Sequence, residues 1–166
     1  MKSLKPLLLL LAFSIVLSSG MKCKKDNIVT PEPTLPAETQ TGAETFGCLV
    51  DGKVFVPKGN FTIPGLSTVI QFNILNLSST RISESIGIGI NNMNSVGEYS
   101  VIGTNRAGYS NKAGQNLDAT DGKVTILKYD KTNKILSGRF YFIGKDAASG
   151  KTINITDGRF DVKYTD

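Results

Sequence analysis

Residues 84–92 read ESIGIGINN, and this stretch decides the fold class. Its three isoleucines, Ile86, Ile88 and Ile90, are each separated by one small or polar residue. Because successive side chains of a β-strand point to opposite faces, this spacing predicts a strand with one buried face. The intervening glycines, Gly87 and Gly89, indicate close backbone packing or a bulge on the other face.

The C-terminal stretch GRFDVKY, residues 158–164, repeats the same alternation. Phe160, Val162 and Tyr164 would point into the core of the domain. The residues between them would point outward: Arg159, Asp161 and Lys163. Two such strands at distant positions indicate that the sheet extends through most of the chain.

No window of a dozen residues past Thr45 carries a helical stripe of apolar side chains. Asp51-Gly52 is the strongest hairpin signal, and the stretches 129–135 and 144–152 are further strand connections. We therefore expect residues 45–166 to form one all-β domain of about seven to nine antiparallel strands. A β-sandwich is the favoured architecture, and a small β-barrel is the alternative.

The N-terminus has the layout of an export signal. Two lysines, Lys2 and Lys5, precede an apolar run from residue 7 to residue 17. That run is shorter than the roughly 20 apolar residues that span a bilayer. Residues 1–22 are therefore predicted to be a signal peptide, and residues 23–44, rich in proline, a disordered tether.

Cys23, directly after the signal, admits two interpretations. It can carry a lipid anchor, although Lys22 stands where lipoproteins usually have a small residue. Alternatively, it can form a disulfide with Cys48. That disulfide would close a loop of about 25 residues and stabilise the fold by roughly 3 kcal/mol. Phe46, Cys48 and Val50 alternate onto one strand face, which predicts a buried free thiol at Cys48 and favours lipidation of Cys23. A lipid-anchored protein of the outer membrane or cell surface follows. The alternative is a soluble protein, periplasmic or secreted.

The charge of the chain argues against a nucleic-acid partner. Three lysines and no acid precede Cys23, so removing the signal lowers the formal net charge from +5 to +2. No basic run longer than two residues follows. The predicted partners are therefore the membrane, through the anchor, and a glycan or a protein.

Several chemistries are disfavoured by the composition. The chain has no histidine, which excludes Ser-His-Asp and Cys-His catalysis and histidine metal sites. Asp118, Asp121 and Asp130 are interpreted as turn acids rather than metal ligands. Asp157 and Asp161 are the nearest approach to a catalytic carboxylate pair. We expect no cofactor, no metal and no enzyme activity, and a carboxylate-based envelope hydrolase is the least favoured function.

Sugar platforms typically need exposed aromatic side chains, and the chain has no Trp. Tyr99 and Tyr109 flank the Gly- and Asn-containing stretch 100–108 and are the candidate ligand-binding residues, as the rim of a glycan site. Tyrosines on the edge of a sheet are the alternative interpretation.

Two segments, ETQTGAETFGCLVDGKVFVP (residues 38–57) and ILSGRFYFIGKDAASGKTINITDGRFDVKY (residues 135–164), resemble a family of small Bacteroidetes envelope lipoproteins of unknown function. Members of that family have a Pro-rich tether, a TQTG…TFGC hairpin and a C-terminal ITDGRFDV strand. The resemblance implies a lipid-anchored protein with a β-rich domain and brings no activity. The sequence thus favours a non-catalytic envelope lipoprotein with a binding or structural role. An accessory glycan-binding component of an outer-membrane uptake system is the alternative.

Overall fold

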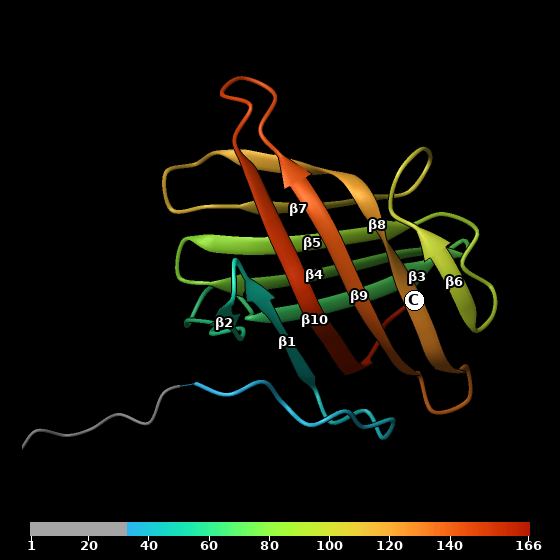
Figure 1. Ribbon diagram of the computed structural model, residues 1–166. Helices are drawn as coiled ribbons and strands as arrows, with labels where there is room; N and C mark the ends of the chain where they lie inside the picture. Colours follow the sequence, from blue (N-terminus) through green and yellow to red (C-terminus); the bar gives the residue numbers. More distant parts are fainter. Residues whose placement is uncertain (1–32) are drawn as a thin grey trace, which may run out of the picture. The chain divides into compact units, whose positions relative to one another are not determined.

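Ten β-strands and no helix make up residues 33–166, the part of the chain that this computed structural model describes (Figure 1). The predicted signal peptide, Cys23 and the first part of the predicted tether lie outside these residues. The strands are β1 (Thr45–Val50), β2 (Lys53–Phe55), β3 (Leu66–Gln71), β4 (Ile74–Arg81), β5 (Glu84–Ile90), β6 (Gly97–Ser100), β7 (Arg106–Ser110), β8 (Asn116–Asp130), β9 (Ile135–Lys145) and β10 (Thr152–Lys163). The predicted all-β class is confirmed. Within residues 33–166, no helix is long and apolar enough to cross a membrane.

The ten strands form one continuous sheet in which every strand pairing is antiparallel. The order is β2-β1-β10-β9-β8-β7-β5-β4-β3, and β6 pairs with β8 outside this path. The sheet curls into a half-barrel, so that β1, β10 and β9 cross in front of β7, β5, β4 and β3 in Figure 1. The fold thus combines the two predicted architectures, because two layers face each other as in a sandwich while the sheet stays continuous as in a barrel.

β8 is the strand that joins the two layers. Its beginning pairs with β7 and its second half pairs with β6, while β9 follows it on the other side. The ladder with β9 shifts register between Ala119 and Asp121 and again between Ile126 and Lys128, and such irregularities bend a strand. Gly122 lies in the first bend with φ of 138°, and a Cβ there would be 2.3 Å from the carbonyl oxygen of Tyr141. The corner therefore requires glycine.

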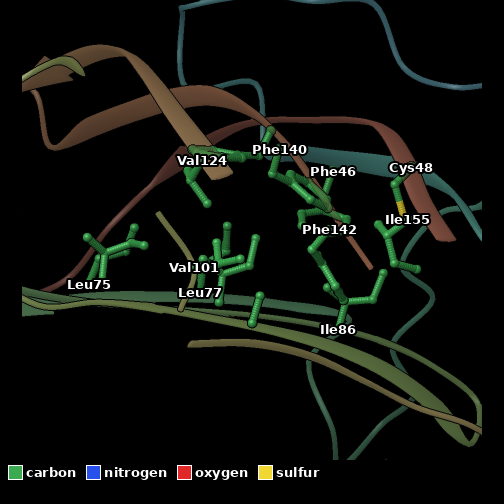
Figure 2. Close-up of a cluster of buried hydrophobic side chains, with 14 of the residues drawn as sticks. Phe46, Cys48, Leu75, Leu77, Ile86, Val101, Val124, Phe140, Phe142 and Ile155 are labelled. Carbon is green, nitrogen blue, oxygen red and sulfur yellow. The ribbon is translucent and has the colours of Figure 1, made fainter. Parts of the chain in front are cut away.

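The core lies between the two layers (Figure 2). Phe140 in β9 stacks on Phe46 in β1 with ring centroids 5.1 Å apart and lies 6.4 Å from the ring of Phe160 in β10. Leu77 and Ile86 face them from the opposite layer. The apolar faces predicted for residues 84–92 and 158–164 are confirmed, because all six of their apolar side chains are at most 5% exposed.

Cys48 lies in this core as a free thiol with no exposed surface. Burial disfavours the thiolate and raises the pKa of Cys48 to about 12. The predicted buried free thiol is confirmed. The predicted hairpin at Asp51-Gly52 is confirmed as well, with both residues at positive φ, as a type I′ turn requires.

The curling of the sheet brings its two edges close at both ends of β3 and β4. The backbone amide of Ile70 in β3 donates to the carbonyl oxygen of Thr165, just after β10, over 2.9 Å. Arg81, at the end of β4, donates to the carbonyl oxygen of Val54 in β2 over 2.9 Å and lies 4.9 Å from the ring centroid of Phe55. These contacts close the half-barrel without a continuous strand ladder.

The predicted outward orientation of Asp161 is wrong, because its side chain is buried with only 1% of the residue exposed. The segment before β1 covers it. Its carboxylate accepts hydrogen bonds of 2.6–3.3 Å from the Thr39 and Thr41 hydroxyls and from the backbone amides of Thr41, Gly42 and Ala43. Strand alternation failed here because a segment more than a hundred residues away packs on the outer face of β10.

The same contacts correct the predicted boundary at Thr45, since the second half of the predicted disordered tether belongs to the folded unit. That unit begins at Pro33. Glu38 forms an ion pair of 2.6 Å with Arg139, and Lys128 donates to the carbonyl oxygen of Gln40 over 2.9 Å. The strand count also differs, since β2 and β6 have only three and four residues and carry little pattern in the sequence.

Candidate functional site

A groove of about 570 Å³ runs across the outer face of β4, β5, β7 and β8. This volume lies within the roughly 300–1,000 Å³ typical of small-molecule sites. Ile86, Ile88 and Tyr109, which alternate with groove residues, have buried side chains on the opposite face. The outward-facing residues of the groove are Asn76, Ser78, Ser85, Gly87, Gly89, Arg106, Gly108, Ser110, Asn116 and Asp118.

Strand register sets the centre of the groove. Ser78 lies opposite Gly87, Gly87 lies opposite Gly108, and Gly108 lies opposite Asp118. These four residues therefore form one row across four neighbouring strands. The two glycines give the row a floor of bare backbone, with a hydroxyl at one end and a carboxylate at the other.

Gly87 is not required by the fold. A Cβ at this position would meet no atom within 4 Å, and its φ lies outside the positive range that favours glycine. Glycine inside a strand costs about 0.5–1 kcal/mol relative to alanine. The sequence-based interpretation of Gly87 as a site of close backbone packing is therefore wrong, because the space above it is open.

Arg106 bounds the groove beside this floor. It lies opposite Gly89, and a Cβ on Gly89 would be 3.2 Å from the Cγ of Arg106. Asn76 lies on the other side of Gly89. The aliphatic part of the arginine thus crosses Gly89, and this second row places an amide and a guanidinium next to the glycine floor.

The charged groups of the groove are available to a ligand. Among residues 33–166, neither Arg106 nor Asp118 forms a salt bridge with another side chain. Arginine offers five donors and an ionised aspartate only acceptors, while the asparagines and serines of the lining do both. The arrangement is suited to binding a polar molecule that presents donors and acceptors on one face.

The predicted rim of Tyr99 and Tyr109 does not form. Tyr109 is 5% exposed, and its hydroxyl donates to Glu84 over 2.7 Å. Its burial, together with this bond, raises the pKa of Tyr109. Tyr99 is half-buried against the core and donates to the carbonyl oxygen of Ser95 over 2.8 Å. Both tyrosine hydroxyls thus form hydrogen bonds within the domain. The interpretation of Tyr109 as part of an exposed platform is wrong, because its side chain is buried.

The acidic residues singled out in the sequence lie apart. Asp130 accepts hydrogen bonds from the backbone amides of Thr132 and Asn133 and caps the turn between β8 and β9. Asp121 accepts from the amide of Gly122 in the bend of β8. Within residues 33–166 no three His, Cys, Asp or Glu side chains are grouped as they would be around a metal ion.

The pair considered for hydrolysis does not face a common cleft. Asp161 is buried beneath residues 39–43. Asp157 is exposed and has a φ of 52°, in the irregular part of β10. Desolvation alone would raise the pKa of Asp161, but the hydrogen bonds that it accepts outweigh burial and hold the pKa below its usual value.

Sequence reasoning missed the groove because its residues come from four strands separated along the chain. Only the register brings Ser78, Gly87, Gly108 and Asp118 into one row. The glycines at every second position of residues 84–92 were the one local signal. Outward glycines mark either a covered surface or an empty one, and the pattern alone does not distinguish them.

Residues 33–166 therefore define an all-β protein whose half-barrel sheet carries a glycine-floored polar groove on its outer face. A family model described as a domain of unknown function, DUF6252, matches residues 61–162, and the chain belongs to this family. The matched region contains the whole groove. The comparisons with curated proteins and with solved structures found no match.

Proposed function

We propose that this protein is a non-catalytic binding protein of the cell envelope and that the groove over Gly87 and Gly108 is its ligand-binding surface. The proposal rests on the open space above Gly87. Neither packing nor backbone conformation calls for glycine there, and a β-branched residue would suit the strand better. Gly87 lowers the stability of the strand and keeps the groove open, and a ligand that occupies this space would explain why glycine is found there.

In this proposal the chain is exported by the signal at residues 1–22 and anchored in the membrane through a lipid on Cys23. The basic start, the apolar run and the cysteine support the anchor. Cys48 supports it too, because a thiol at 0% exposure in the core is poorly placed to pair with Cys23. The domain would face the periplasm or the cell surface.

A saccharide is the ligand class that the lining favours, which would make the protein an accessory glycan-binding component. Sugar hydroxyls donate and accept at once, and the groove offers Arg106 as a donor, Asp118 as an acceptor and Asn76 as both. The floor of two facing glycines leaves room for a sugar ring, which larger side chains at these two positions would exclude. The groove could therefore bind a sugar through hydrogen bonds, without stacking it on an aromatic side chain.

The test is a glycan-array screen of the full chain beside two matched variants. Gly87→Val fills the groove, and Asn154→Val adds the same side chain at an exposed position of β10 in the other layer. We expect binding that Gly87→Val abolishes and Asn154→Val retains. Arg106→Ala and Lys53→Ala form a second pair, each removing one exposed positive charge, and only the first is expected to weaken binding. Binding that survives Gly87→Val would place the ligand elsewhere.

A further inference from the structure

Three loops meet at one end of the sheet, on the right-hand side of Figure 1: the β3–β4 turn, the β5–β6 loop and the β6–β7 loop. The amide of Met93 donates to the carbonyl oxygen of Asn73 over 2.8 Å, which joins the first two loops. The amide of Asn91 donates to Oδ1 of Asn105 over 2.8 Å, and its side chain donates to the carbonyl oxygen of Thr104. These loops form one surface, which we call the loop end.

The loop end carries no charge. None of residues 71–74, 91–97 and 100–105 is Asp, Glu, Lys or Arg, although charged residues make up 20% of the chain. The polar side chains in these ranges are amides and hydroxyls, and several of them bond within the loops. Asn105, for example, also donates to the carbonyl oxygen of Ser100 over 2.7 Å. The loop end is thus low in the groups that are most expensive to remove from water.

Apolar side chains project from all three loops. Phe72 is 87% exposed, Val96 is 56% exposed and Ile102 is 47% exposed. Ile74, next to the first turn, is 38% exposed. Single exposed apolar residues are ordinary, but a set at the tips of three connected and uncharged loops marks an interaction surface.

Phe72 does not serve the turn in which it lies. Phe72 and Asn73 have φ values of 51° and 61°, the two central positions of a type I′ turn, where Asn-Gly is preferred. A bulky residue is rarely found at positive φ, because its Cβ approaches the backbone there. This aromatic ring is therefore held in an unfavourable conformation and is nearly fully exposed, so the packing of the described domain does not account for it.

We propose that the loop end inserts Phe72, Val96 and Ile102 into the interfacial region of a lipid bilayer. Separate tips that project from different loops suit a medium that deforms around them, whereas a protein partner would need a matching pocket for each. The acyl-chain boundary that the tips would reach accepts apolar side chains and disfavours charged ones, which matches the composition of the loop end. The hydrogen bonds between the loops keep backbone groups paired when water is withdrawn.

The charges beside the loop end indicate the kind of lipid. Glu98 and Arg106, which directly follow two of the loops, have opposite signs, and Glu98 pairs with Lys123 over 2.7 Å. Among residues 33–166, no cluster of cations accompanies the apolar tips, unlike in segments that recognise anionic lipids. Insertion is therefore expected in zwitterionic phosphatidylcholine, with little effect of added phosphatidylglycerol or of salt.

The absence of tryptophan from the chain makes a direct test simple. Phe72→Trp and Val96→Trp each introduce a single fluorophore at the loop end. Phe61→Trp is the matched control, because Phe61 is fully exposed in the β2–β3 loop, outside the loop end. Each full-length variant is reconstituted with phosphatidylcholine vesicles whose acyl chains are either brominated or not.

Interfacial insertion places apolar side chains about 5–10 Å into the headgroup–acyl boundary, within reach of the brominated acyl chains. Bromine should therefore reduce the Trp emission roughly twofold at positions 72 and 96. The Trp emission at position 61 should not change. Equal emission from brominated and plain vesicles at both loop positions would overturn the proposal. Quenching at all three positions would overturn it as well, since contact would not be specific to the loop end. A blue shift without vesicles that grows with protein concentration would assign the loop end to a second copy of the chain. The groove is not part of the loop end, so this experiment does not test the proposed binding of a ligand in the groove.

Discussion

The hydroxyl of Thr39 donates a 2.6 Å hydrogen bond to the carboxylate of Asp161, which lies 122 residues further along the chain. Thr41, Gly42 and Ala43 donate to the same carboxylate. A group of donors around one buried carboxylate holds the segment before β1 against the outer face of β10. Asp161 is therefore a central contact of this segment, beside the Glu38–Arg139 ion pair and the Lys128–Gln40 hydrogen bond.

Replacing Asp161 with Asn should destabilise the domain by about 1–3 kcal/mol, because the amide nitrogen cannot accept the bonds that Oδ2 now receives. Urea unfolding followed by circular dichroism measures the difference. Asp157→Asn is the control, since that side chain is exposed on the same strand. Equal stability of the two variants would show that the contacts of residues 39–43 contribute nothing.

The contribution of Asp161 should also depend on pH. Its pKa in the folded protein is below the unfolded value of about 3.9. The stabilisation is therefore fully present above pH 4 and is lost as the pH falls through the folded pKa. The difference in unfolding free energy between the original protein and Asp161→Asn should shrink below about pH 4. A difference that stays constant down to pH 2.5 would contradict this assignment.

Cys48 should react with thiol reagents only when the domain opens. Its pKa of about 12 leaves almost no thiolate at neutral pH, and the side chain has no exposed surface. Labelling with a maleimide, followed by mass spectrometry of the fragment that contains Cys48, should be slow in buffer and fast in denaturant. Rapid labelling of the folded protein would mean that β1 detaches readily from the core.

Two glycines should respond to substitution in opposite directions. Gly87→Val should stabilise the fold by about 0.5–1 kcal/mol, because the site is open and the strand favours β-branched residues. Gly138→Ala should destabilise it by about 1–3 kcal/mol, since the new Cβ would lie 2.4 Å from the carbonyl oxygen of Thr125 and 2.7 Å from the ring of Phe160. Thermal unfolding compares the two, and a loss of stability in Gly87→Val would show that the groove glycine has a structural role.

Local patterns were sufficient for the class of fold. The isoleucines of residues 84–92 and the apolar residues of 158–164 are buried as predicted, because alternation within a strand needs no knowledge of the strand's partners. The hairpin at Asp51-Gly52 was predictable for the same reason, since turn chemistry is local. The curl of the sheet was not, because it depends on the bends within β8.

Long-range pairing accounts for what the sequence did not reveal. Asp161 alternates as an outward residue, and only the segment at residues 39–43 makes its position a buried one. The groove arises where Gly87 and Gly108 lie opposite each other, and these residues belong to strands that are not consecutive in the chain. Both features require the register of the whole sheet.

The contacts of the segment before β1 also determine how the fold responds to mechanical tension. A pulling force applied to the chain at Pro33 first meets the hydrogen bond from Arg159 to the carbonyl oxygen of Pro36 and then the Glu38–Arg139 ion pair. The bonds to Asp161 come next, and all of these contacts precede Thr45 in the chain. Only after these contacts rupture does the load reach the ladder between β1 and β10. The sheet is thereby shielded from tension along its N-terminal segment, up to the force at which residues 36–43 detach.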